Sequence, residues 1–171
     1  MRAFIVAASI AALSAEVQAD VLWGKAESGA SLEDISAIYP DGIRINPTDK
    51  QKNNSGASLQ YMIKNIDIVK KNFEVGFYFL DGKLSSVGLK HDSKDQTYVC
   101  EGTFDGIYEA LVSKYGREIK KSRNGGLGVS KNASWSIGRT TISLNMFSFG
   151  NPDCAIFLNY SSRLSQESEN L

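Results

Sequence analysis

The sequence has little of what most catalytic sites are built from. It contains one histidine, His91, and two cysteines, Cys100 and Cys154, among 171 residues. A Ser-His-Asp or Cys-His arrangement would have to use His91, and a lone histidine at the end of a predicted strand is more often structural. Two thiols and one distant histidine are too few for a four-ligand zinc site. We therefore expect no metal, no cofactor and no enzymatic activity.

An excess of charge of either sign is also missing. Nineteen Lys and Arg residues balance nineteen Asp and Glu residues, which gives a formal net charge of zero. A neutral chain does not attract partners over long distances by its overall field. We therefore expect no nucleic-acid partner.

Beyond the first residues, the sequence has no long apolar run. Those first residues combine Arg2, the apolar stretch Phe4–Leu13 and the small-residue motif VQA at 17–19, which is the pattern of a cleavable secretory signal. The apolar stretch is shorter than the about 20 residues of a membrane-spanning helix. We expect residues 1–19 to be a signal peptide, Asp20 to begin the mature chain, and the protein to be periplasmic or secreted without stable membrane insertion.

The two cysteines fit that location. Cysteines in an exported chain are usually paired, so we expect a Cys100–Cys154 disulfide, with two buried thiols as the alternative. A bond that closes a loop of roughly 55 residues stabilises a fold by about 4 kcal/mol in the chain-entropy model.

Two segments have helical periodicity. Ser31 and Asp34 resemble a capping box before a short helix that ends at Pro40. A second, longer helix ends at Gly116. Its apolar face is formed by Phe104, Ile107, Tyr108, Leu111, Val112 and Tyr115.

Strand patterns follow each helix. After the first helix they cover 43–46, 59–69, 73–80 and 83–91. The parity of the apolar positions predicts a three-residue loop at 80–82, an even-length turn near 139–140 and an odd-length loop at 150–152. The fold class is therefore α+β, with two related units in which a helix precedes an antiparallel β-meander. The units cover about 32–91 and 103–161 of a single domain at 20–164, and the polar tail at 165–171 is expected to be disordered.

A family resemblance rests on four features of the second unit. These are a cysteine before the second helix, the motif KYG at 114–116, the motifs ASWSIG at 133–138 and TISL at 141–144, and a final strand that carries Cys154. Together they resemble small uncharacterised periplasmic proteins of proteobacteria. The architecture is also similar to that of tandem α/β inhibitors of the β-lactamase-inhibitor kind. The resemblance implies a binding role but transfers no functional residue.

One basic cluster surrounds a glycine-rich stretch at 124–128. The candidate partner-binding residues are Arg117, Lys120, Lys121, Arg123 and Lys131, with Lys114 nearby and Trp23 as a separate aromatic candidate. Exposed backbone N–H groups beside cations suit an acidic partner or an anionic ligand. The alternative is a mobile, solvated loop without function. We expect the segment from Lys120 to Lys131 to be mobile in the free protein because it has few apolar residues.

An acidic stretch precedes the basic one, and Asp105 and Glu109 lie one helical turn apart within it. Carboxylates near a helix start usually favour the helix dipole, so we give an acid/base pair little weight. The sequence predicts a binding protein, most concretely a proteinaceous inhibitor or immunity-type protein that acts on an envelope enzyme or toxin. The alternative function is an envelope accessory protein that binds an anionic cell-wall or lipid fragment at the glycine-rich loop.

Overall fold

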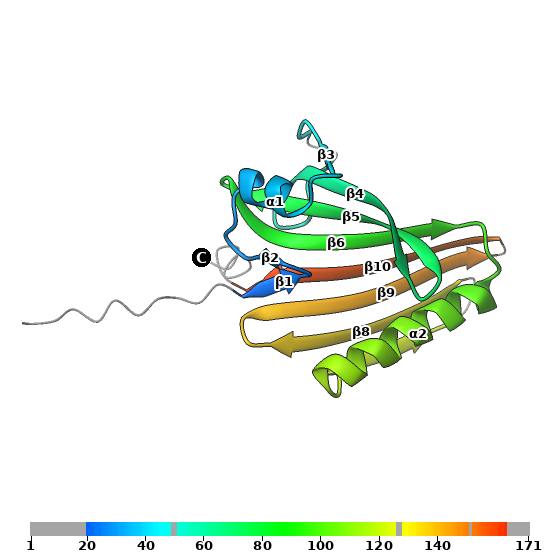
Figure 1. Cartoon of the computed structure of the whole chain (residues 1–171). Helices are drawn as coiled ribbons and strands as arrows, with labels where there is room; N and C mark the ends of the chain where they lie inside the picture. The colour runs from blue at the N-terminus through cyan, green and yellow to red at the C-terminus, as the bar shows by residue number, and fades with distance from the viewer. Residues whose placement is uncertain (1–19, 49–50, 126–127, 151, 164–171) are drawn as a thin grey trace, which may run out of the picture.

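The computed structural model describes residues 20–48, 51–125, 128–150 and 152–163 (Figure 1). The signal peptide predicted at 1–19 and the tail predicted at 165–171 lie outside these residues. An eight-stranded antiparallel sheet has the strand order β3-β4-β5-β6-β10-β9-β8-β7. Its strands are β3 (Ile43–Arg44), β4 (Ser58–Ile68), β5 (Lys71–Leu80), β6 (Lys83–Ser93), β7 (Lys120–Asn124), β8 (Val129–Ile137), β9 (Thr140–Gly150) and β10 (Asp153–Ser162).

The remaining elements all lie on one face of this sheet (Figure 1). They are the hairpin of β1 (Val21–Trp23) and β2 (Ala26–Glu27) and the helices α1 (Leu32–Ile38) and α2 (Thr97–Tyr115). Helix α2 packs against β8, β9 and β10, whereas α1 packs against β4. The α+β class with a large antiparallel sheet is confirmed. Each helix precedes four strands, and the relation between the two halves as repeated units remains a prediction.

Helix α1 begins with the predicted capping box. The Asp34 N–H donates to the Ser31 hydroxyl (3.2 Å), and the Ser31 N–H donates to the Asp34 carboxylate (2.9 Å). Both bonds satisfy N–H groups that lack partners at a helix start. The bonds from Ser31 also lower the pKa of Asp34 below its ordinary value. Helix α2 starts earlier than predicted, at Thr97, so Cys100 lies inside it.

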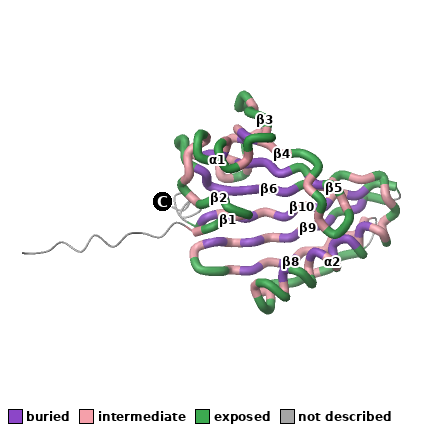
Figure 2. Tube along the Cα trace, viewed as in Figure 1, coloured by how far each residue is buried: buried purple, intermediate pink, exposed green. Residues whose placement is uncertain are grey.

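The core lies between the helices and the inner face of the sheet (Figure 2). Side chains alternate along each strand, so every second residue points inward. The largest fully buried side chains on the described residues include Trp135, Phe73, Phe77, Phe104, Leu144, Met146 and Ile156. The Trp135 indole N–H donates to the Gly116 carbonyl (2.9 Å), which ties the end of α2 to β8.

Two of the three turn predictions were wrong, although the apolar faces were right. Leu80 pairs with Lys83, so the β5–β6 loop has two residues, both with positive φ. The strand register is corrected by a bulge at Ser85 instead of by a longer loop. Likewise, Gly150 pairs with Asp153, and the extra residue is Phe149. A bulge shifts residue parity by one, just as an odd-length loop would.

The third turn prediction is confirmed. Ile137 pairs with Thr140 across a two-residue turn between β8 and β9. The paired strands then place Trp135 opposite Ile142 and Ala133 opposite Leu144. Apolar residues of the same parity therefore meet on the core side of the sheet, as the sequence predicted.

Candidate functional site: the open face of the sheet

The most unusual surface lies on the side of the sheet away from the helices. Its residues are the outward positions of β8, of β9 as far as Phe147, and of β10 from Ala155 onward. They are Ser130, Asn132, Ser134, Ser136, Thr141, Ser143, Asn145, Phe147, Ala155, Phe157, Asn159 and Ser161, and we call them the neutral face. None of them is charged, although 22% of the whole chain is Asp, Glu, Lys or Arg. Solvated protein surfaces are usually about 25–35% charged, so this face differs from an ordinary wet surface.

The strand register sets these polar side chains opposite one another. Asn132 pairs with Asn145, Ser134 with Ser143, and Ser143 with Asn159. Amides and hydroxyls carry both donors and acceptors, so the face offers either kind of hydrogen bond across three adjacent strands. The supporting sheet is rigid because the inner sides of the same strands are fully packed.

Aromatic residues border the neutral face at the end of β9. The rings of Phe147 and Phe157 meet edge to face with centroids 6.3 Å apart. Phe149 is 85% exposed and Phe147 is 36% exposed. The bulge that corrects the β9–β10 register occurs at Phe149, and bulges commonly redirect a side chain in this way. Exposed phenylalanines at such density favour a contact role over a solvated one.

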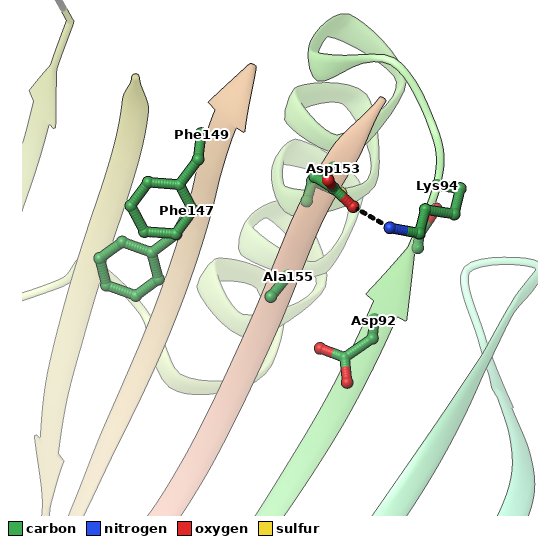
Figure 3. A pocket seen from close by; sticks show the side chains of 8 residues that line it. Asp92, Lys94, Phe147, Phe149, Asp153 and Ala155 are labelled. Carbon is green, nitrogen blue, oxygen red and sulfur yellow. Dashed lines mark hydrogen bonds and ion pairs between the residues drawn. The ribbon is translucent and has the colours of Figure 1, made fainter. Parts of the chain in front are cut away.

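A hollow of about 480 Å³ opens beside these rings (Figure 3). Figure 3 looks onto the open face, with α2 behind the strands. Asp92, Lys94, Asp153 and Ala155 line the hollow together with the phenylalanines. The Lys94 ammonium pairs with the Asp153 carboxylate at 2.5 Å, and Lys90 pairs with Asp92 at 2.5 Å. The charges at this end are therefore neutralised in pairs.

The two cysteines meet at the same end of the molecule. Cys100 on α2 and Cys154 on β10 lie at disulfide-bonding distance, with their Cα atoms 6.5 Å apart. Cys154 also contributes to the wall of the hollow. The pair links α2 to β10, which is the strand of the neutral face next to β6.

The basic cluster is not the free loop that the sequence predicted. Lys120 to Asn124 form strand β7, paired with β8, and only residues 126–127 between Lys120 and Lys131 lie outside the described part. The Lys121 ammonium lies 3.5 Å from the centre of the Tyr108 ring. The Arg123 guanidinium donates twice to Glu101 (3.1 and 2.8 Å). Residues 120–124 of the segment that was expected to be flexible thus form a strand, and the side chains of Lys121 and Arg123 contact α2.

The acidic and basic stretches of the sequence face each other in space. Lys131 is hydrogen bonded to Asp105, and its ammonium also lies 4.9 Å from the Phe104 ring. Asp105 is therefore used in a contact between α2 and β8, while Glu109 is exposed on the helix. Intramolecular pairing leaves these cations less able to bind an external anion. Arg117 and Lys120 are exposed.

Trp23 and His91 have internal contacts. Trp23 stacks on Tyr39 with ring centroids 5.9 Å apart and meets Phe77 edge to face. His91 Nδ1 bonds the carbonyl of Asn72 at 2.8 Å. Because a carbonyl only accepts, Nδ1 carries the proton in this arrangement. Neither residue belongs to the neutral face.

Comparison of the chain with protein families, curated proteins and solved structures found no match. The resemblance to envelope inhibitors therefore stays a prediction, and function has to be argued from the surface itself. No helix among residues 20–48, 51–125, 128–150 and 152–163 is long and apolar enough to cross a membrane. Over the same ranges, no group of three or more His, Cys, Asp or Glu side chains is placed to hold a metal.

Sequence reasoning missed the neutral face although a signal was present. Alternation was used only to find the apolar positions of each strand. The intervening positions at 130–136, 141–147 and 155–161 are occupied by serine, threonine, asparagine, alanine and phenylalanine, with no charged residue among them. In these strands the apolar residues alternate with polar residues that carry no charge. That absence of charge is the feature that would have indicated the neutral face.

Proposed function

We propose that this protein is a binding protein that docks a protein partner on its neutral face. The partner is an enzyme or toxin of the cell envelope, and the protein acts on it as an inhibitor or immunity-type protein. The single observation that carries this proposal is the absence of charge from the outward positions of β8, of β9 as far as Phe147, and of β10 from Ala155 to Ser161.

The composition of the face supports a protein partner. Charged residues are depleted at the centres of protein interfaces, where aromatic residues are enriched. Binding surfaces of antibodies likewise combine aromatic anchors with serine and asparagine, which supply adaptable hydrogen bonds. Phe147 and Phe149 provide exposed anchors, and anchors of this kind carry most of the energy of an interface. A face built on a packed sheet also loses little conformational entropy on binding.

A second copy of the chain is a less suitable occupant. Two sheets that pack face to face form a dry layer of interdigitated apolar side chains. Most positions of the neutral face are hydroxyls or amides, which would lose their water without matched partners. A heterologous partner with complementary polar groups avoids that penalty.

The location and the internal repeat belong to the same proposal. Paired cysteines persist in oxidising compartments, and the cysteines of α2 and β10 lie at bonding distance, which supports a periplasmic or secreted protein. Each helix is followed by four strands, and the two sets meet where β6 pairs with β10. This arrangement supports two related units that together form one continuous binding face.

The alternative site at the glycine-rich loop has weaker support. Lys121, Arg123 and Lys131 are engaged by the side chains of α2, so an anionic ligand would have to displace internal partners. Catalysis by Asp105 with Glu109 has no support from a surrounding cleft, because the hollow beside Phe147 and Phe149 lies on the other side of the sheet.

A capture experiment with matched variants tests the proposal. Immobilised mature protein is exposed to envelope extract in three forms: wild type, Ser143→Arg in the middle of the neutral face, and Glu109→Arg on the exposed side of α2. We expect wild type and Glu109→Arg to retain the same protein, and Ser143→Arg to bind it at least about tenfold more weakly, which is about 1.4 kcal/mol. Thermal unfolding checks that both variants are folded. Equal capture by Ser143→Arg would contradict the assignment of the face.

A further inference from the structure

A second hollow, which shares Phe157, Asn159 and Ser161 with the neutral face, lies beside Tyr78 on β5. Gly76 of β5 and Gly88 of β6 are direct cross-strand partners on the open face. A Cβ atom placed on Gly76 would lie 3.2 Å from Cε2 of Tyr78, and one placed on Gly88 would lie 3.3 Å from the same atom. The tyrosine ring therefore lies across both glycines, where an added Cβ atom would require it to shift by a few tenths of an ångström.

The ring borders a hollow of about 530 Å³, which is within the range of about 300–1,000 Å³ for small-ligand sites. Uncharged hydrogen-bonding groups and one further aromatic ring form its walls. The lining residues are Asn53, Asn54, Ser55, Ser86, Phe157, Asn159 and Ser161, in addition to Tyr78. They come from the loop before β4 and from the strands β5, β6 and β10.

Hydrogen bonds fix the loop wall of this hollow in place. The side-chain amide nitrogen of Asn53 donates to the Ser86 hydroxyl (3.0 Å) and so connects the loop to β6. The side-chain oxygen of Asn53, Oδ1, accepts from the Ser55 hydroxyl (2.8 Å) and from the Ala57 backbone N–H (2.9 Å). A wall that is already ordered costs little conformational entropy when a ligand binds.

We infer that this hollow binds a neutral saccharide. One face of a sugar ring presents C–H groups that pack well on an aromatic ring, and its hydroxyls both donate and accept hydrogen bonds. Tyr78 supplies the ring, while Asn159 and the Asn53 loop supply amides and hydroxyls. A nucleotide or a sugar acid would need cations, which such ligands usually recruit, and none lines the hollow. Lys90 lies nearby on β6, but its ammonium is paired with Asp92 (2.5 Å).

This site goes beyond the docking of a protein partner, and it can be tested without one. The mature protein, labelled with ¹⁵N, is titrated with cellotriose, maltotriose or chitotriose while amide chemical shifts are followed by NMR. We expect saturable shifts at Gly76, Gly88 and Asn159 with at least one trisaccharide, and none with glucuronic acid. The absence of saturable shifts with all three sugars would overturn the proposal.

Variants separate the saccharide site from the partner surface. We expect Tyr78→Ala to lower saccharide affinity at least tenfold, and Tyr78→Phe to keep most of it because the ring remains. Ser134→Arg lies on β8, one strand further from Asn159 than Ser143, and should bind the saccharide as wild type does while it loses the protein partner. Unchanged saccharide affinity in Tyr78→Ala would refute this site and leave the partner proposal standing. Loss of shifts in Ser134→Arg as well as Tyr78→Ala would overturn the separation of the two sites.

Discussion

The two sides of the sheet use the same strands for different purposes. On the helix side, apolar side chains form the core, and the charges of α2 and β7–β8 pair with one another around it. On the open side, the residues of the neutral face carry no charge, and no helix covers them. The difference teaches that the charges of β7 and β8 that face α2 serve its internal docking. The surface left for recognition is defined by its lack of charge.

The largest contrast between the sides is expected in stability. Trp135 is buried and donates a hydrogen bond to the end of α2, so Trp135→Ala should lower the free energy of unfolding by about 3–5 kcal/mol. Its neighbour Ser134 points to the open face, and Ser134→Ala should change that energy by no more than about 0.5 kcal/mol. Urea unfolding of both variants measures the contrast. Similar losses for the two would contradict the assignment of inner and outer faces.

The cysteine pair tests how firmly the helix side is held. Replacing Cys100 and Cys154 together by alanine should lower the free energy of unfolding by about 2–4 kcal/mol, since the cross-link no longer restricts the unfolded chain. The matched control is Ala155→Ser, which lies beside Cys154 on the open side. Melting of each protein with and without reductant gives the result. Equal melting temperatures for wild type and the double variant would show that the pair contributes nothing.

The basic residues of strand β7 provide another test of the difference between the two sides of the sheet. From the sequence alone, Lys121→Glu with Arg123→Glu was expected to weaken partner binding and spare stability. The structure reverses that expectation, because Lys121 lies over the Tyr108 ring and Arg123 is bonded to Glu101. We now expect a loss of about 1 kcal/mol in the free energy of unfolding, discounted for solvent exposure. Partner affinity should stay unchanged, which titration at low salt will show.

The variant pair Lys120→Glu with Ser122→Glu is the matched control, because these residues alternate with Lys121 and Arg123 along β7 and so point to the open side. It should leave stability nearly unchanged. A larger loss in the free energy of unfolding in this control than in the Lys121 and Arg123 double variant would contradict the assignment, because the stabilising contacts of β7 would then lie on its open side.

The smallest effect concerns acid stability. A hydrogen bond from Lys71, and a second from Ser93, hold the pKa of Asp95 below its ordinary value of 3.8. A carboxyl group with a lowered folded pKa stabilises the fold above its unfolded pKa, and that contribution is lost as pH falls through the folded value. Asp95→Asn should therefore lower the urea midpoint at neutral pH slightly and flatten its dependence below the ordinary pKa. An unchanged acid profile would show that the Lys71 contact is not maintained in solution.

Local pattern was enough for much of the fold. Apolar alternation predicted the four strands of the first half within a few residues, and Ser31 and Asp34 predicted the start of α1. Strand β7 was missed because 120–124 contains no apolar residue, and the start of α2 was missed because the apolar periodicity that predicts the helix begins at Phe104. The predictions of loop length were wrong where bulges occur at Ser85 and Phe149. A bulge and an odd-length loop shift the parity of the apolar positions in the same way, so the sequence does not distinguish them.

The candidate sites were less predictable than the fold. Lys121, Arg123 and Lys131 were correctly noticed as a cluster, but their partners on α2 are set by helix packing across the sheet. The sequence does not single out Tyr78, because nothing local indicates that Gly76 and Gly88 pair beneath it. Contacts between residues far apart in sequence depend on register, which a single sequence specifies only weakly.

The sequence by itself determined which residues could form strands, which helix start would be capped and which side chains had to be buried, because these depend on neighbours a few residues away. The tertiary structure decided that both helices and the β1–β2 hairpin cover the same side of the sheet and that β6 pairs with β10. Only that choice turns the uncharged positions of three strands into one open face. The physical reason is that burying one apolar side of each strand fixes the other side toward water, whereas the order of the strands is set by long-range packing.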